Sequence, residues 1–215
     1  MAVTHASFSK HNFYTFCDLL AEKDSDLGNI IQCHGYPPMW TRTNTFRTIL
    51  LTILEQQVSL ASAYAAYKKL FEKVIRVTPE TIQQLSDQEL RSCYLSRQKI
   101  VYARALSNAI ITKQLKLKRF HYASDDEIRT ELKKIKGIGD WTVDIYLIHV
   151  LRRTDIFPLG DLALVNSIKE VKKLKPDSTK EEITSLSESW RPYRSIATMI
   201  LWHQYIKKRN IKLLM

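Results

Sequence analysis

The sequence predicts an all-α protein. Apolar residues recur at helical spacing along most of the chain, residues that cap helix N-termini precede several of these stretches, and the alternating pattern of a β-strand is scarce. The chain has 215 residues, enough to bury a sizeable core in one domain or in two small lobes. We therefore expect a fold built from helices.

The first long helical pattern covers Thr45 to Lys73. The polar segment Gln56–Ser59 interrupts the apolar spacing, which predicts two helices joined by a polar corner. Before this pattern, the pair Pro37-Pro38 lies in an extended connector. The apolar residues of the pattern are Phe46, Ile49, Leu50, Ile53, Leu54, Val58, Leu60 and Ala61.

Capping residues mark helices that follow. Ser86 precedes Asp87-Gln88-Glu89-Leu90 and predicts a short helix, while residues 98–114 carry apolar side chains at helical spacing. Ser124 precedes three acids, which the positive end of a helix dipole favours, so a helix is expected to begin there. The remaining helices are expected at 126–135, 141–151, 161–171, 180–187 and 192–208.

Composition excludes several classes of protein. Hydrophobic residues make up 45% of the chain and charged residues 26%, as in ordinary globular domains. No apolar run reaches the roughly 20 residues that cross a bilayer, and residues 1–10 lack the core of a secretory signal. We therefore expect an intracellular protein of the cytoplasm, nucleoid or nucleus. The three cysteines are too widely spaced for a zinc or iron–sulfur site and are expected to be buried or half-buried free thiols.

The formal net charge of +11 is a strong bias at this length. A polyanionic partner, either nucleic acid or an acidic membrane face, is the usual implication, although many basic proteins are merely soluble. Lysine and arginine gather at residues 113–119, 169–175 and 207–209. These clusters form either solvated faces or contacts to phosphate.

The turn between the helices at 126–135 and 141–151 contains Gly137 and Gly139. One of these glycines can adopt a positive φ, and both leave room for close approach to the backbone. Amide groups at the N-terminus of the second helix then favour an anion such as phosphate. Two interpretations remain: an anion-binding hairpin, whose carbonyls can also hold a monovalent cation, or a tight connection without a ligand.

Asp161 follows Gly160 and precedes Leu162-Ala163-Leu164, which is the position of a helix N-cap. Most aspartates in this position only cap the helix. The position also keeps a carboxylate ionised, and an ionised carboxylate in a cleft can stabilise a sugar with oxocarbenium character or orient an attacking water. The two roles are compatible.

The large aromatic residues and the polar corner each allow a structural and a functional interpretation. Most of the aromatics are expected in the core, although a base flipped out of a duplex needs aromatic walls. The corner at 54–59 is either an exposed link or a tip that enters a duplex and fills the gap left by the extruded base. The aromatic residues considered are Trp40, Trp141, Trp190, Trp202, Tyr193 and Tyr205.

Three blocks stand out in combination: Ile53-Leu54-Glu55-Gln56-Gln57-Val58-Ser59; Ile135-Lys136-Gly137-Ile138-Gly139-Asp140-Trp141-Thr142 with Phe157-Pro158-Leu159-Gly160-Asp161; and Trp190-Arg191-Pro192-Tyr193-Arg194-Ser195-Ile196-Ala197 with Leu201-Trp202. In this order they resemble the helix–hairpin–helix DNA glycosylase superfamily, most closely its alkylation-repair branch, the 3-methyladenine DNA glycosylase II type. The resemblance covers residues 53–202.

The resemblance implies a two-lobed helical bundle with an active-site cleft between the lobes. The central lobe would cover residues 45–153 and contain the helix–hairpin–helix motif at about 127–151. Both chain ends, 1–44 and 154–215, would build the second lobe.

The resemblance also implies roles for individual residues. Asp161 falls on the catalytic aspartate of the family, and Trp202, together with Trp141, on the aromatic lining of the base pocket. Gln57, with Gln56 beside it, falls on the wedge that enters the duplex. The hairpin that grips the DNA backbone falls on Gly137, Ile138, Gly139 and Asp140.

Three positions depart from the family pattern. Gln57 stands where leucine is common, so its amide would stack in the gap or bond the orphan base. Glu55 replaces a small residue and brings a negative charge near the DNA. Tyr94 stands in a turn where many relatives have glycine.

The residues after the hairpin glycines are Asp140-Trp141, whereas bifunctional relatives carry there a lysine that attacks the sugar and cleaves the strand. The resemblance therefore implies a monofunctional DNA glycosylase. It would flip out alkylated purines of the 3-methyladenine type from duplex DNA and excise them by hydrolysis, leaving an abasic site. A purine methylated at N3 or N7 is cationic and leaves without protonation, so no cofactor and no catalytic metal are expected. We expect a monomer that needs damaged double-stranded DNA but no protein partner and no membrane.

Two alternatives remain open. A glycosylase for uracil or for oxidised or deaminated bases would share the hairpin but needs hydrogen-bond donors for a neutral leaving group. A catalytically weak homologue would bind lesions or abasic sites without excision. Asp161 argues against the second alternative, whereas Gln57 and Glu55 leave room for it.

Overall fold

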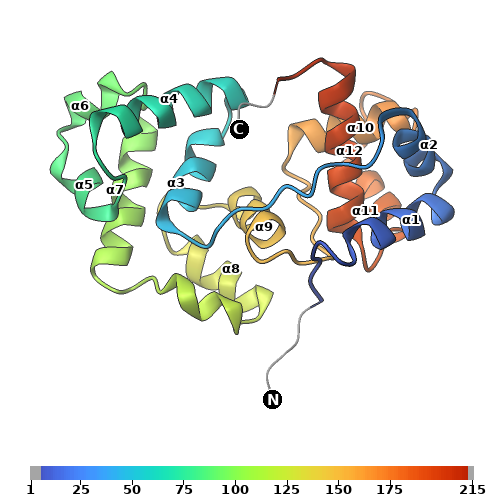
Figure 1. Cartoon of the computed structure of the whole chain (residues 1–215), viewed down its shortest axis with the longest axis horizontal. Helices are drawn as coiled ribbons and strands as arrows, with labels where there is room; N and C mark the ends of the chain where they lie inside the picture. Colours follow the sequence, from blue (N-terminus) through green and yellow to red (C-terminus); the bar gives the residue numbers. More distant parts are fainter. Residues whose placement is uncertain (1–5, 213–215) are drawn as a thin grey trace. The chain divides into compact units, whose positions relative to one another are not determined.

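The computed structural model describes residues 6–212 and is all-helical, as predicted (Figure 1). Within these residues the only β-pairing is one isolated antiparallel bridge between Ser7 and Arg153. The described chain divides into two compact units. The first contains Arg42–Tyr146, and the second contains Leu147–Lys212 together with residues 6–41.

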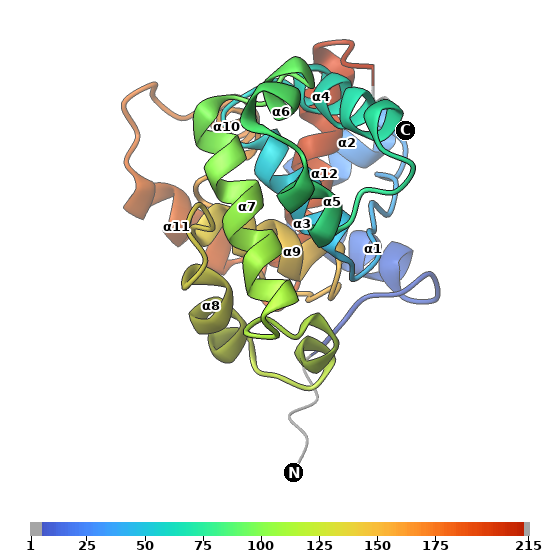
Figure 2. The same ribbon diagram turned by 90° about the vertical axis from the view of Figure 1, so that its left-hand side faces the viewer.

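The first unit is built around α7 (Arg97–Ile111), which packs against three other helices of the unit. Figure 2 shows these neighbours along its length: α3 (Phe46–Glu55), α5 (Pro79–Gln84) and α6 (Asp87–Ser92). The remaining elements are α4 (Leu60–Lys73), the 3₁₀ helix η1 (Leu117–His121), α8 (Asp125–Lys133) and α9 (Asp140–His149), which ends in the second unit. The core contains Leu50, Ile53, Leu54, Ala103, Leu106, Ile128, Leu132 and Val143.

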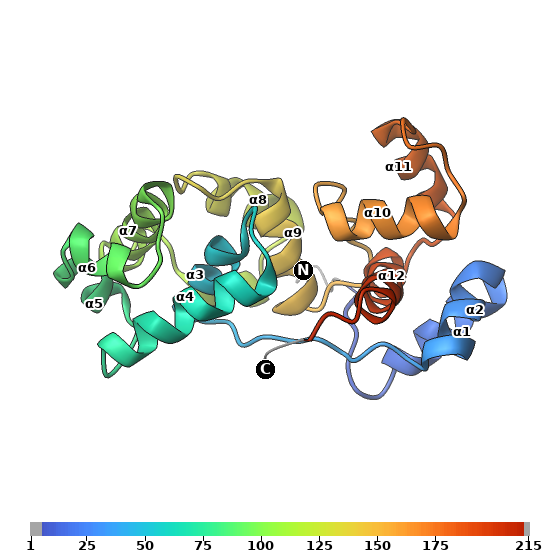
Figure 3. The same cartoon turned by 90° about the horizontal axis from the view of Figure 1, so that it is seen from above.

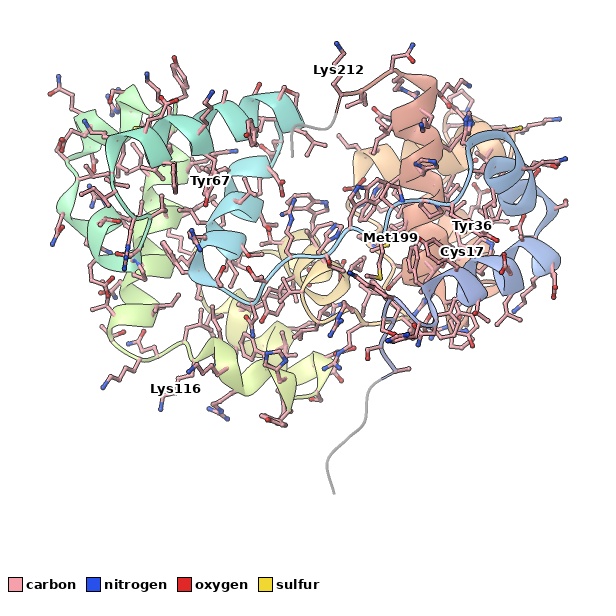
Figure 4. The ribbon with its side chains drawn as sticks, in the orientation of Figure 1. Cys17, Tyr36, Tyr67, Lys116, Met199 and Lys212 are labelled. Atoms are coloured by element: carbon pink, nitrogen blue, oxygen red, sulfur yellow. The ribbon has the colours of Figure 1, made fainter. Side chains whose placement is uncertain are left out.

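The second unit is built around α12 (Arg194–Lys208), which is buried from Ser195 to His203. Figure 3 shows α12 with its packing partners α1 (Phe13–Lys23), α2 (Ser25–His34) and α10 (Leu162–Val171); α11 (Lys180–Glu188) completes the unit. Cys17 of α1 and Met199 of α12 are fully buried (Figure 4). Burying so many apolar side chains of one helix makes α12 the axis of this unit.

The helices predicted from spacing and caps are present, with ends that differ by a few residues. Ser86 and Ser124 each form a capping box, and Asp161 is the N-cap of α10, which confirms these three assignments. The sequence patterns did not identify α1, α2 or α5. No side chain caps the N-terminus of α1, and α5 has only six residues, so neither presents a long local signal.

The three cysteines are free thiols, as expected. Cys17 and Cys93 are buried, and burial raises the pKa of Cys17 to about 12. The prediction that all three are at least half-buried is wrong for Cys33, which is exposed near the end of α2. No helix in the described range 6–212 is long and apolar enough to cross a membrane.

The turn between α8 and α9 depends on Gly137. Its φ is +95°, and a Cβ placed on it would lie 2.0 Å from Cγ of Tyr102. The aromatic ring of α7 therefore packs directly against the turn, which only a residue without a side chain allows. Gly139 differs, because a Cβ there would meet no atom of the protein within 4 Å.

Two ion pairs join α8 to α9. Arg129 and Lys133 lie four residues apart on α8, as do Asp140 and Asp144 on α9. The Arg129–Asp144 distance is 2.5 Å and the Lys133–Asp140 distance is 2.6 Å. Burial raises the pKa of Asp144 to about 6, although Arg129 opposes this change.

We predict that Gly137→Ala lowers the free energy of unfolding by about 2–4 kcal/mol, because the added methyl group collides with Tyr102 and the backbone is left-handed. Gly139→Ala is the matched control and should stay within about 1 kcal/mol of the wild type. Urea denaturation measures both. An equal loss for the two variants would contradict the packing described for Tyr102.

We also predict a pH-dependent effect of Asp144→Asn. Between its ordinary pKa and about 6, Asp144 holds a proton in the folded state but not in the unfolded state. The wild type therefore loses stability relative to the variant as the pH rises from about 4 to about 6, in total by roughly 2–3 kcal/mol, and the difference is constant above that range. Chemical denaturation of both proteins across this range measures it; a difference that does not change with pH contradicts the assignment.

Candidate functional site

Asp161 is held at the N-terminus of α10 by two hydrogen bonds to the same carboxylate oxygen. Its Oδ1 accepts from the amide of Leu164 at 2.9 Å and from Nε1 of Trp202 at 3.0 Å. The residue is half-buried. Donated N–H groups and the positive end of the helix dipole both favour an anionic carboxylate with a fixed orientation.

Trp202 forms a wall beside this carboxylate. The side chain lies on α12, and its indole ring stacks on the ring of His149, with centroids 5.5 Å apart and planes 12° apart. Nδ1 of His149 lies 2.8 Å from the carbonyl oxygen of Trp40. Because a carbonyl only accepts, Nδ1 carries the hydrogen, and this bond fixes the orientation of the imidazole.

His149 was not among the residues singled out from the sequence, and Trp40 was considered only as one of several aromatics. The run from Val143 to Val150 is apolar apart from Asp144 and His149, so the histidine looked like part of a buried helix face. It is indeed buried. Only the fold shows that its ring stacks on Trp202.

The third sequence block, residues 190–202, holds the segment that leads to Asp161. Nε of Arg194 donates to Asp155 at 2.8 Å, and the hydroxyl of Ser195 accepts from the amide of Ile156 at 2.9 Å. Farther along, the hydroxyl of Ser167 on α10 donates to the carbonyl of Leu201 on α12 at 2.7 Å. These bonds fix α10 against α12, so the block positions the carboxylate and its aromatic neighbour together.

The hairpin lies at the edge of a pocket of about 280 Å³ in the first unit. Gly139 and Asp140 are exposed, whereas Ile138 is buried and anchors the turn. The open space above Gly139 suits close approach of an external group to the backbone. The pocket is lined by Gln56, Gln57, Gln98, Lys99, Tyr102, Gly137, Ile138 and Gly139.

The side chains of the described residues form no metal-binding cluster. The group of side chains needed for a metal, three or more His, Cys, Asp or Glu, is not found within residues 6–212. The carbonyl of Gly137 accepts a hydrogen bond from Gln56, and that of Ile135 accepts from Ile138. A monovalent cation at the hairpin stays a prediction.

The two glutamines of the corner have different environments. Gln57 is exposed and adopts a left-handed conformation, with φ of +57°. The side chain of Gln56 turns inward, where Nε2 donates to the carbonyl of Gly137 at 2.8 Å and to the hydroxyl of Thr142 at 2.9 Å. Gln57 is therefore the residue of the pair at the tip, and Gln56 binds the hairpin.

Two departures from the family pattern have a structural reason. Glu55 forms a two-fold ion pair with Arg42, at 2.6 and 2.8 Å, so its charge is neutralised within the protein. Tyr94 has a φ of +65°, which is the conformation that glycine adopts at no steric cost. The turn is therefore retained with tyrosine in it, and the side chain is 68% exposed.

Trp141 lies in the first turn of α9 and is half-buried. It belongs to the first unit, whereas Asp161 and Trp202 belong to the second. The assignment of Trp141 to a base pocket stays a prediction.

Several residues of the basic clusters are already paired with acids. Glu170 accepts from Arg209 at 2.5 Å and lies 3.2 Å from Lys208, and Lys172 binds Asp24 and Asp26. These bases are less able to contact phosphate than their number suggests. Lys116, after α7, is exposed and its side chain points away from the ribbon (Figure 4).

Comparison with known proteins gives consistent matches. The model of the HhH-GPD superfamily base excision DNA repair protein matches residues 50–192. The Bacillus subtilis protein YfjP is 31% identical over 83% of this chain and 65% of its own length. A DNA-3-methyladenine glycosylase of the same organism is 29% identical over 73% of this chain and 56% of its own length.

The structure of Schizosaccharomyces pombe 3-methyladenine DNA glycosylase in complex with abasic-DNA is also similar. It has a TM-score of 0.81 and 25% identity, over 94% of this chain and 99% of that one. The chain spans less than two thirds of the length of both Bacillus relatives. The family match nevertheless covers the hairpin, the corner and Asp161 together. The chain therefore belongs to the HhH-GPD superfamily of base excision DNA repair proteins.

Proposed function

We propose that the chain is a monofunctional DNA glycosylase that removes alkylated purines of the 3-methyladenine type from duplex DNA and leaves an abasic site. The observation that carries this proposal is the pairing of Asp161 with Trp202. A fixed carboxylate and an aromatic wall, joined by a hydrogen bond of 3.0 Å, are the two elements that base removal requires.

Asp161 acts on the sugar. As the bond between C1′ and the base breaks, positive charge develops on the sugar, and a carboxylate that is already oriented stabilises that charge without reorganising. Water then completes the hydrolysis at C1′. The alkylated purine is cationic before it leaves, so no acid is needed to protonate it.

Trp202 acts on the base. An electron-rich indole face attracts a cationic ring more strongly than a neutral one, which favours methylated purines over normal bases. The imidazole of His149 stacks on one face of the indole. The extruded base is therefore expected to contact the opposite face or the edge of the indole. We also assign Trp141 to the lining of the base pocket.

The hairpin and the corner act on the DNA backbone and the duplex. The hairpin of Gly137, Ile138, Gly139 and Asp140 binds a phosphate of the backbone. The amide of Ile138 is already bonded to the carbonyl of Ile135, so the contact is assigned to the exposed end of the turn, where Gly139 is open to close approach. Gln57, exposed at the tip of the corner, enters the duplex and occupies the gap left by the extruded base. The residues after the glycines include no lysine, so strand cleavage through a Schiff base has no nucleophile there.

Named relatives support the substrate class. The Bacillus subtilis and Schizosaccharomyces pombe proteins are named for 3-methyladenine, and the latter has been seen with abasic-DNA. We extend this class to the present chain because Asp161 and the hairpin lie within the matched region, residues 50–192, and Trp202 follows that region on α12.

We predict that Asp161→Asn reduces the single-turnover rate of 3-methyladenine release by at least about 10²–10³-fold. The amide oxygen of asparagine still accepts from Leu164 and Trp202, so the change removes the charge and keeps the local fold. Binding to DNA with a stable abasic-site analogue should change by less than about threefold. Asp177→Asn, on an exposed loop, is the control; retention of excision by Asp161→Asn would contradict the mechanism.

A panel of duplexes tests the substrate class. We expect the full-length chain to release bases from methylated DNA and not from DNA that contains uracil or 8-oxoguanine, because only the methylated purines leave as neutral molecules without a proton. Base release is measured by chromatography. Release of uracil or 8-oxoguanine instead assigns the chain to a sister class of glycosylase, and binding without any release assigns it to lesion-binding homologues.

A further inference from the structure

Three consecutive residues before the tip of the corner are anchored, each by a different part of the first unit. The carbonyl of Leu54 accepts from Nζ of Lys99 on α7. The carboxylate of Glu55 pairs with Arg42 of the connector before α3. The side-chain amide of Gln56 donates to the carbonyl of Gly137 in the turn between α8 and α9.

The anchors stand next to a strained residue. Gln57 has a φ of +57°, a region that side-chain-bearing residues adopt at a cost. Such a conformation persists only where the surrounding structure determines it. Here the anchored residues precede Gln57 directly, and Ser59 follows as the N-cap of α4.

Gln56 is the anchor that joins the tip to the hairpin. Its Nε2 carries two hydrogens, and two acceptors lie at 2.8 and 2.9 Å, so both hydrogens are used. One acceptor is the carbonyl of Gly137, and the other is the buried hydroxyl of Thr142 in the first turn of α9. A displacement of the tip therefore breaks bonds to both the turn and the helix that follows it.

The tip and the hairpin also border one space. Gln57 and Gly139 both line the pocket of about 280 Å³, as do the bonded residues Gln56 and Gly137. A partner that contacts the hairpin through Gly139 thus meets Gln57 on the same side of this unit.

We propose that Gln56 is a positioning residue that locks the Gln57 tip to the hairpin, so that gripping of the backbone and entry into the duplex occur as one rigid-body step. This inference rests on the proposed function, because it takes Gln57 as the residue that enters the duplex. Gln56 itself touches neither the sugar nor the base. Loss of the Gln56 side-chain amide is therefore expected to slow the opening of the duplex, a step that precedes the chemistry at Asp161.

The test uses fluorescence to separate opening from chemistry. The full-length protein is added to a duplex with a stable abasic-site analogue and 2-aminopurine as the neighbouring base, whose fluorescence rises when it unstacks. Gln56→Met keeps the length of the side chain and removes the donors, and Gln56→Glu keeps the shape but cannot donate. We expect each variant to reduce the fluorescence rise on this duplex by about tenfold. The single-turnover rate of base release from methylated DNA should fall by a similar factor, which is the effect of losing a buried hydrogen-bonded contact.

Gln83→Glu is the matched control. Gln83 on α5 is half-buried, does not line the pocket, and its amide donates to the backbone carbonyl of Arg104 at 2.9 Å. The variant adds the same charge and removes the same kind of bond as Gln56→Glu but leaves the hairpin anchor intact, so both readouts should stay within about threefold of the wild type. Gln56→Asn, one methylene shorter, replaces any Gln56 variant whose thermal unfolding shows that it does not fold.

A double-mutant cycle with Gln57→Ala decides the mechanism. If Gln56 acts through Gln57, the double variant should be no worse than Gln57→Ala alone. Full fluorescence in the folded Gln56 variants, or strictly additive losses with Gln57→Ala, overturns the proposal. The proposed function fails separately, when the wild type opens the duplex but releases no base.

Discussion

The hydrogen bond from the indole of Trp202 to the carboxylate of Asp161 is the contact around which the second unit is arranged. It joins the start of α10 to the middle of α12, and those two helices are fixed to each other by Ser167 and Leu201. The loop before Asp161 is held in turn by Arg194 and Ser195 at the start of α12. The buried helix α12 therefore positions the carboxylate of Asp161, the indole of Trp202 and the loop that precedes Asp161. A site made this way needs little reorganisation when it meets a substrate.

In the first unit, ion pairs neutralise the acids near the proposed DNA-binding surface. Glu55, Asp140 and Asp144 are acids at or near the surface assigned to DNA, and each is paired with an arginine or a lysine. The acids therefore serve as structural links without adding a net negative field beside the phosphates. The apparent anomaly of Glu55 disappears once Arg42, thirteen positions earlier in the chain, lies against it.

Local sequence signals predicted most of the fold and part of the site. Helix caps such as Ser86 and Ser124 bond to residues within the next three positions, so the sequence alone can predict them. The N-cap position of Asp161 is predicted in the same way. The contacts of Gln56 and His149 join residues 81 and 109 positions apart, and no periodicity reports such a pairing. The patterns did not predict α1, whose N-terminus has no side-chain cap, or α2, although Asp24 caps α2 locally and is also bound by Lys172 and Trp190 from far along the chain. The spacing of apolar residues predicts which face of a helix is buried, but it does not identify the residues that pack against that face.

The two glycines of the hairpin turn are under different physical constraints. Gly137 is required by the protein itself, because the ring of Tyr102 leaves no room for a side chain. Gly139 faces open space, so no atom of the protein excludes a side chain there, and the restriction comes from the proposed contact with the DNA backbone. A lineage that kept this fold and abandoned DNA would retain the first glycine and become free to change the second. The residue at the second position is thus a marker, readable from sequence alone, that separates relatives still in contact with a backbone from those that inherit only the architecture.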